Sequence, residues 1–279
     1  MRVAAIQLNS GSDAEANLDA ATRLLRRAAG AGAEFAVLPE KWLCLGSAEA
    51  LAGSAEALDG PSLTAIAGLA GNLGLAVVAG SIVERHGDHL HNTSVLFDRE
   101  GRHVAAYRKI HMFDVEVEGT AYRESDLERA GTEPVLAPLG DRRVGLTVCY
   151  DLRFPELYRE LAVAGAELIT CPAAFTAATG RDHWEVLVRA RAIENQLFVV
   201  AAGQYGTAEP HYRSYGRSMI VDPWGTVLAT APDVAETVVV ADLDFCRMAE
   251  LRERFPSLAN RRPGAYRAPG ITTAQAVVA

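Results

Sequence analysis

Apolar residues along the chain follow two periods, one typical of strands and one typical of helices. Short runs of apolar and β-branched residues predict strands at 3–8, 35–40, 75–84, 142–148, 166–173, 197–204 and 237–244. Apolar positions three and four residues apart predict helices at 17–32, 62–74, 155–165, 182–196 and 246–255. Turn signals predict hairpins at 92–110 and 218–230. This alternation of strands and helices is typical of an α/β fold.

Two stretches of the chain resemble each other. The sequence AGAEFAVLPE (Ala31–Glu40) aligns with AGAELITCPA (Ala164–Ala173), and the preceding strands RVAAIQL and RVGLTVC also correspond. Each stretch is followed by a helix, a strand and a hairpin, which indicates an internal duplication. Two similar halves could bury their sheets against each other, with helices outside. We therefore predict a four-layer α-β-β-α sandwich with two mixed sheets face to face.

Two segments lack a clear period. Residues 111–134 are interpreted as a long functional loop, and the stretch from about Pro256 to the last residue is interpreted as an irregular tail. We take residues 1–279 as a single domain that includes this tail.

Composition and charge narrow the functional classes. The 279 residues carry a formal net charge of −8 without a basic tail, which gives nucleic-acid binding little electrostatic support. The longest apolar run is far shorter than the ~20 residues that cross a bilayer, and the first residues lack the core of a signal peptide. The four cysteines are widely spaced and form no CxxC pair, which argues against a zinc ribbon. We expect a cytoplasmic protein with reduced thiols and no membrane partner.

Cys149 stands where a predicted strand ends and a predicted helix is about to begin. Unpaired backbone N–H groups at a helix start favour a thiolate, and N–H groups at such a corner can bind the oxyanion of a tetrahedral intermediate. A catalytic nucleophile and a buried structural cysteine are equally compatible with this stretch taken alone.

A thiol nucleophile needs a base, and no pattern marks any of the seven histidines for this role. Glu40 and Lys109 each end a predicted strand, at the edge where the sites of α/β proteins gather. Taken alone, each residue is more often a solvated charge at a strand end. If both converge on Cys149, however, a carboxylate could take the thiol proton while an ammonium stabilises the developing oxyanion.

Three segments resemble the Glu, Lys and Cys signatures of the nitrilase superfamily of carbon–nitrogen hydrolases: FAVLPEKW, YRKIHMFD and GLTVCYDLRFPELYR. The similarity continues through GTAYRESD, PAAFTAATGRDHWEVLVRARAIENQ and RSYGRSMIVDPWGTVLA, from about Arg2 to Asp244. Three motifs in the right order are a specific signal. Within the superfamily, the sequence is most similar to the Nit-type amidases, and its motifs resemble those of the deaminated glutathione group most.

The resemblance implies a fold, a mechanism and an assembly. It makes Cys149 the nucleophile, Glu40 the general base and Lys109 the oxyanion stabiliser. Glu124, in YRESD, matches a second family glutamate with a positional or proton-handling role, and the backbone N–H of Tyr150 is the expected second oxyanion donor. The family fold is the four-layer sandwich, and its members usually dimerise. The chemistry requires no metal and no organic cofactor.

The resemblance also implies the substrate class. We expect hydrolysis of a small carboxylate-bearing carboxamide to acid and ammonia through a thioester, with deaminated glutathione as the expected substrate. Arg153 is the first candidate for the substrate carboxylate, and Phe175 and Thr176 are candidates for the pocket wall. The alternatives are an omega-amidase for alpha-ketoglutaramate, an N-carbamoyl amide hydrolase, a glutaminase that feeds a synthetase, and a non-catalytic binding module.

Overall fold

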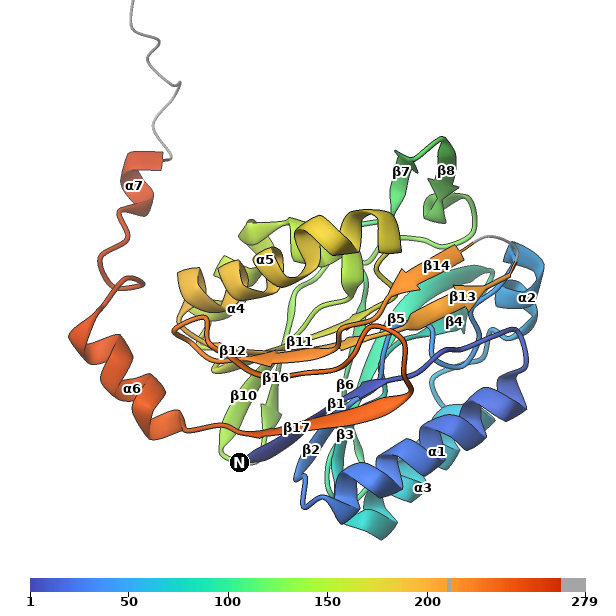
Figure 1. Ribbon diagram of the computed structural model, residues 1–279, viewed down its shortest axis with the longest axis horizontal. Coiled ribbons are helices and arrows are strands. Elements are labelled where there is room, and N and C mark those ends of the chain that lie inside the picture. Colours follow the sequence, from blue (N-terminus) through green and yellow to red (C-terminus); the bar gives the residue numbers. More distant parts are fainter. Residues whose placement is uncertain (210–211, 267–279) are drawn as a thin grey trace, which may run out of the picture.

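The computed structural model describes residues 1–209 and 212–266. Two β-sheets are stacked face to face, and helices cover the outer face of each (Figure 1). The predicted four-layer α-β-β-α sandwich of two mixed sheets is therefore confirmed.

The first sheet has seven strands, and its parallel centre carries an antiparallel strand on either side. Its path runs β17 (Thr237–Asp242), β1 (Arg2–Gln7), β2 (Phe35–Val37), β3 (Ala76–Val78), β5 (His89–Phe97) and β4 (Ile82–His86), and β6 (His103–Arg108) also pairs with β5.

The second sheet has six strands arranged on the same plan. Its path runs β16 (Val227–Thr230), β15 (Met219–Val221), β12 (Phe198–Gly203), β11 (Leu168–Ala173), β10 (Arg142–Leu146) and β9 (Val135–Leu139). In both sheets three consecutive parallel strands are followed by an antiparallel hairpin, which is the arrangement that an internal duplication predicts.

Helices cover the two outer faces. α1 (Ala14–Gly30) and α3 (Pro61–Leu73) pack on the first sheet, whereas α4 (Pro155–Val163) and α5 (Ala177–Asn195) pack on the second (Figure 1). The remaining helices are α2 (Ala48–Gly53), α6 (Phe245–Arg254) and α7 (Pro263–Tyr266). α7 lies in the predicted irregular tail, so that prediction is wrong for this turn of helix, and the tail from 267 onward falls outside the described residues.

Strand β1 shows why the sandwich forms. Val3 and Ala5 belong to the core between the sheets, and Ala4 and Ile6 face the outer helices. Successive side chains of a strand point to opposite faces, so a strand that is apolar at every position is buried on both sides.

Two predicted segments are corrected by the structure. Residues 75–84 form two strands, β3 and β4, because the chain turns at Gly80, whose φ is +46°. A Cβ at Gly80 would overlap the carbonyl oxygen of Pro39, so glycine permits this close approach. The expected loop 111–134 contains a hairpin, β7 (Asp114–Val117) and β8 (Thr120–Arg123), which stands up beside the sandwich (Figure 1).

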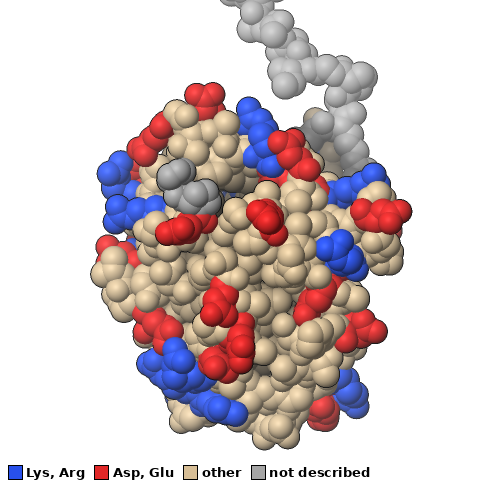
Figure 2. Space-filling model, turned by 90° about the vertical axis from the view of Figure 1, so that its right-hand side faces the viewer, with Lys and Arg blue, Asp and Glu red and all other residues tan. Residues whose placement is uncertain are grey.

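A second hairpin, β13 (Tyr205–Ala208) and β14 (Tyr212–Tyr215), lies near the same end of the molecule. On the face shown in Figure 2, Lys and Arg side chains lie mainly toward the edge, whereas Asp and Glu side chains also occupy the middle. In the part of the chain that the structure describes, no helix is long and apolar enough to cross a membrane.

Candidate active site

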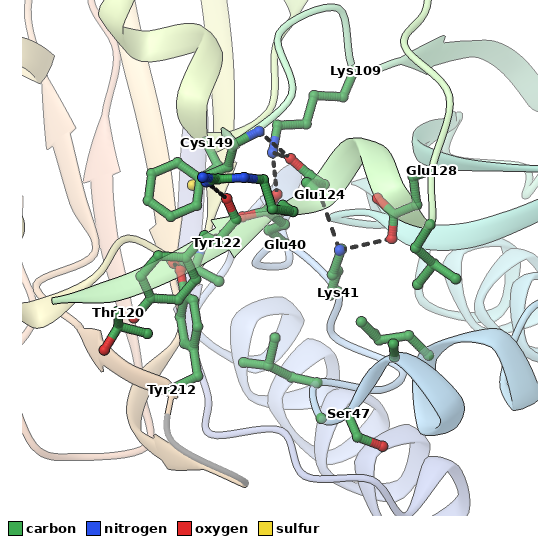
Figure 3. A pocket seen from close by; sticks show the side chains of 18 of the residues that line it. Glu40, Lys41, Ser47, Lys109, Thr120, Tyr122, Glu124, Glu128, Cys149 and Tyr212 are labelled. Carbon is green, nitrogen blue, oxygen red and sulfur yellow. Dashed lines mark hydrogen bonds and ion pairs between the residues drawn. The ribbon is translucent and has the colours of Figure 1, made fainter. Parts of the chain in front are cut away.

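Four of the predicted residues meet at one end of the sandwich (Figure 3). Glu40 follows β2 and Lys109 follows β6, whereas Cys149 begins a short 3₁₀ helix, η2 (Cys149–Arg153), after β10. Glu124 begins another, η1 (Glu124–Asp126), after the β7–β8 hairpin. All four line a single cavity, so the convergence that the sequence reasoning required is present.

The cysteine lies in a strained turn. Its φ is +47°, a left-handed conformation that costs a non-glycine residue about 1–3 kcal/mol and is common at active sites. The buried carboxylate of Asp151 holds the turn: Oδ2 accepts from the backbone N–H of Val148 at 2.8 Å and from the Tyr107 hydroxyl at 2.8 Å, and Oδ1 lies 2.7 Å from Nδ1 of His111. The sequence reasoning missed Asp151, although its position two residues beyond the cysteine could have suggested it.

Glu40 is held from three directions. Its Oε1 accepts from Nζ of Lys109 at 3.1 Å and from Nδ2 of Asn92 at 2.9 Å. Its Oε2 accepts from the backbone N–H of Ala174 at 2.8 Å, which ties the first sheet to the second. The carboxylate lines the same cavity as the Cys149 thiol and lies near enough to raise the pKa of that thiol. A base so fixed beside a thiol is placed for proton transfer.

Glu124 likewise accepts three hydrogen bonds. Its Oε2 accepts from Nζ of Lys109 and from the backbone N–H of Phe113, both at 2.7 Å, and its Oε1 accepts from Nδ2 of Asn92 at 3.0 Å. Burial by itself would raise the pKa of this carboxyl, but the ammoniums of Lys109 and Lys41 and the hydrogen bonds hold its pKa well below the usual range. These contacts therefore favour the ionised form of Glu124.

The thiol and the amine respond oppositely to their surroundings. Burial, together with the charge of Glu40, raises the pKa of the Cys149 thiol well above its usual value, against the opposing effect of Lys109. Burial and the charge of Glu40 thus act against the thiolate, in the opposite direction to the effect expected of a helix start. Burial opposes the charge of Lys109, but Glu124 and Glu40 raise the pKa of its ammonium.

The cavity beside these residues has a volume of about 440 Å³, within the range of small-molecule sites. Its wall combines charged and apolar side chains, with Tyr122, Arg123, Leu127 and Tyr212 among them. Cys149 is 7% exposed and opens onto this space, so its sulfur is not walled off from substrate.

The other predicted residues line a second space that adjoins the large cavity. Tyr150, Arg153, Phe175 and Thr176 share a second space with Cys149, of only about 10 Å³. The Arg153 guanidinium lies 4.8 Å from the ring centroid of Phe175 and 3.2 Å from Nδ1 of His183. These residues thus adjoin the nucleophile but do not line the larger cavity.

Among residues 1–209 and 212–266, no group of three or more His, Cys, Asp or Glu side chains could hold a metal ion. Asn92 is a further site residue that the sequence reasoning missed. Its single amide nitrogen donates to both Glu40 and Glu124, a role that a polar residue inside an apolar strand could have suggested, because buried polar groups need partners.

Comparison with known proteins supports this geometry. The model of the carbon–nitrogen hydrolase family matches residues 2–253. The chain is 41% identical to deaminated glutathione amidase of Mus musculus over 95% of its own length and 84% of that protein. It is 36% identical to omega-amidase NIT2 of Bos taurus, covering 95% of this chain and 96% of that one.

Among solved structures, Nit3 of Saccharomyces cerevisiae, a member of branch 10 of the nitrilase superfamily, superposes with a TM-score of 0.83. The two chains are 30% identical, and the match covers 92% of this chain and 94% of that one. The family model spans both sheets, and the similarity extends from sequence to fold. The chain therefore belongs to the carbon–nitrogen hydrolase family.

Proposed function

We propose that the chain is a cysteine-dependent amidase that hydrolyses a small carboxylate-bearing carboxamide through a thioester intermediate. The observation that carries this proposal is the convergence of Glu40, Lys109, Glu124 and Cys149 on one cavity. A non-catalytic module would have no need of a strained cysteine beside an ordered base and a buried ammonium.

The thiol is protonated at rest, so attack on the amide carbon must be coupled to loss of its proton. Glu40 accepts this proton and then passes it to the leaving nitrogen, which leaves a thioester on Cys149. Glu40 next activates a water molecule that releases the acid. Lys109 and the backbone N–H of Tyr150 stabilise the oxyanion formed in each step.

Glu124 acts through position in this scheme. A carboxylate that accepts from two ammonium or amide side chains and one backbone N–H stays ionised, so it does not exchange protons at neutral pH. Its contact with Lys109 holds that ammonium beside the sulfur. Of the two roles open to this residue, the positional one is supported by its low pKa.

The arrangement of the two spaces orients the substrate. Glu40 lines the large cavity and not the small one. Because Glu40 must reach both the leaving nitrogen and the attacking water, the amine and the water occupy the large cavity. The acyl part then points toward Arg153, which makes no ion pair with a carboxylate within the described ranges 1–209 and 212–266. A carboxylate there would require the guanidinium to move off Phe175, since about 10 Å³ holds at most one water molecule.

Deaminated glutathione is the proposed substrate, as the name of the mouse relative suggests, and alpha-ketoglutaramate is the alternative suggested by the omega-amidase. Both carry a carboxylate for Arg153. They differ in the amine that leaves, because a primary amide releases ammonia whereas deaminated glutathione releases cysteinylglycine. The expected release of ammonia therefore applies to alpha-ketoglutaramate and not to deaminated glutathione. A leaving-group cavity of about 440 Å³ favours the larger amine. N-carbamoyl amides remain a third choice on the same chemistry.

The test compares kcat/KM for the two amides by measuring the keto acid that both release. We expect deaminated glutathione to be the better substrate and Cys149→Ala to abolish both reactions. Faster turnover of alpha-ketoglutaramate would favour the omega-amidase alternative. Replacing Arg153 with leucine should lower the preference for acidic over neutral amides, and an unchanged preference would remove Arg153 from the site.

We further propose that the protein is a cytoplasmic homodimer that needs no cofactor. All four cysteines are free, as expected in a reducing compartment. Ile193, Trp224 and Phe255 are exposed apolar residues that lie together: the Trp224 and Phe255 rings are 6.3 Å apart, and Ile193 adjoins Gly225. Such a patch is typical of an interface. Light scattering should give twice the chain mass, and Trp224→Glu should reduce it.

A further inference from the structure

Five charged side chains of alternating sign form a row along the cavity (Figure 3). The row begins with the established contacts of Glu40, Lys109 and Glu124 at 3.1 and 2.7 Å. It then continues from Oε1 of Glu124 to Nζ of Lys41 at 3.5 Å, and from Lys41 to Oε1 of Glu128 at 2.8 Å. The proposed mechanism uses the first three groups and leaves the last two unexplained.

The backbone conformation at Lys41 directs its side chain toward Glu124. Lys41 follows Glu40 directly and has a φ of +50°, a conformation that is strained for a residue with a side chain. The hydroxyl of Ser81 accepts a hydrogen bond from its backbone N–H at 3.1 Å and fixes this turn. As a result, two adjacent side chains approach Glu124 from different sides, Glu40 by way of Lys109 and Lys41 directly.

The outer pair is buried at a cost in stability. Lys41 is 8% exposed and Glu128 is 1% exposed. In the described part of the chain, the ion pair with Lys41 at 2.8 Å is the one side-chain contact that the Glu128 carboxylate makes. Burial raises the pKa of Glu128 to about 7. Since a buried ion pair is weak evidence for stability, this pair calls for a functional explanation.

The placement of the ammonium groups supplies that explanation. Glu40 and Glu124 share two donors, Lys109 and Asn92, and two carboxylates that share one ammonium tend to take up a proton. A protonated Glu40 could not accept the proton of the thiol. Lys41 adds a second positive charge, and its contact is with Glu124 and not with Glu40.

We infer that Lys41 is a positioning residue that lets Glu40 and Glu124 remain ionised together and reserves Glu40 for the sulfur, with Glu128 as its buried counter-ion. This inference rests on the proposed function. The charged groups around Lys41 are Glu40 on the same turn, Lys109 after β6, and Glu124 and Glu128 at η1 and just beyond it. Arg123 and Glu209 line the same cavity.

The decisive variants are Lys41→Met and the double variant Lys41→Met/Glu128→Gln. In both, we expect kcat to fall about 10- to 100-fold, within the range for impaired general-base catalysis. KM should change less than about threefold, because Lys41 acts on the base and not on bound substrate. The acid limb of the kcat/KM profile should move up by about one pH unit as a proton enters the two-carboxylate pair. Lys41→Arg, which keeps the charge, should restore most of the activity.

Lys41→Met leaves Glu128 buried without its counter-ion, which could prevent folding. The double variant removes both charges and so keeps the test valid in that case. If the pair served the structure alone, removing both charges would leave kcat and the pH profile as in the wild type, and this result would overturn the inference. Glu84→Gln is the matched control for loss of a buried carboxylate: Glu84 pairs with Arg108 at 2.6 Å and does not line the cavity. Its kcat should stay within about twofold of the wild type.

A second readout separates this inference from the choice of substrate. The rate at which iodoacetamide alkylates Cys149 reports on the base without any amide substrate. The measurement uses a Cys246→Ser background, because Cys246 is exposed, and Cys149→Ala as a blank. We expect the double variant to react about tenfold more slowly at neutral pH. An inactive wild type with this slowing would refute the proposed amides alone, whereas equal rates would refute the role of Lys41.

Discussion

The two halves of the molecule are nearly identical at one end of their sheets and different at the other. At the amino end of β1, the backbone N–H of Arg2 donates to the Glu34 side chain at 2.9 Å. The Arg2 guanidinium donates to the carbonyl of Ala31 at 3.4 Å. In the second half, the corresponding contacts run from Arg143 to the Glu167 side chain at 3.2 Å and to the Ala164 carbonyl at 3.3 Å. The repeated AGAE sequence thus makes the same connection twice.

At the carboxyl ends of the strands the halves diverge. In the first half, PEK follows β2 and places Glu40 and Lys41 beside the cavity, whereas the position of β11 that aligns with Glu40 is Ala173. Conversely, the position of Cys149 aligns with Leu8, which is fully buried in the first half. The two halves are alike at the amino ends of their strands, where the contacts hold the fold together. They differ at the carboxyl ends, where the side chains that carry the chemistry lie.

The largest loss of activity should come from removing the base in the first half or the nucleophile in the second half. Glu40→Gln and Cys149→Ala should each reduce turnover at least about 10³-fold, because each removes one partner of the same proton transfer. The double variant should fall little further, since groups that act as a unit are not additive. Amide turnover measures the loss of activity, and mass spectrometry of the trapped thioester shows whether the acyl-enzyme forms. Cys246→Ser is the control. Additive losses would show that the two halves act independently.

Asp151 should be next in size, because it holds the nucleophile turn that only the second half possesses. Asp151→Asn places an amide among donors, so we expect a loss of about 2 kcal/mol in the free energy of unfolding, together with reduced kcat. Urea denaturation measures the stability. Asp141→Asn, at a side chain that is 82% exposed, is the control and should leave both quantities unchanged. A stable and fully active Asp151→Asn would disprove the role of this carboxylate.

Glu128, in the first half, should make the free energy of unfolding depend on pH. Its folded pKa of about 7 lies above that of a free glutamate, so the native state binds the proton more tightly. The stabilising contribution is complete below the unfolded pKa and is lost as the pH rises through 7. Relative to Glu128→Gln, the wild type should therefore lose up to about 1.4 kcal/mol per pH unit across that interval. Thermal melting of both proteins from pH 5 to 8 would show this, and parallel curves would contradict it.

The smallest effect concerns the end at which the halves match. Removing the glutamate of either AGAE sequence breaks equivalent hydrogen bonds, but the Glu34 side chain is 45% exposed and that of Glu167 is 17% exposed. Exposed ion pairs contribute about 0–1 kcal/mol, so Glu34→Ala should cost less than Glu167→Ala, and neither should change kcat. Urea midpoints provide the comparison. A reversed order would mean that burial does not control these contacts.

Local pattern predicted most of the fold. The strands and the main helices follow from apolar periods, because each element must bury one or both faces against a neighbour. The pattern failed where backbone geometry overrides it. Gly80 divides an apolar run that reads as one strand, and the hairpin formed by β7 and β8 has partly exposed strands without a clear alternation.

The sequence by itself determined the duplicated α/β plan and, through its ordered motifs, the family to which the chain belongs. What only the tertiary structure decided is how Glu40, Lys41, Asn92 and Glu128 share charge and protons with Cys149. Periodicity records how each element is buried, and it holds no information about which polar groups from distant strands come within 3 Å of one another. Those distances depend on how the two sheets stack, and they raise the pKa of Lys109 and lower that of Glu124.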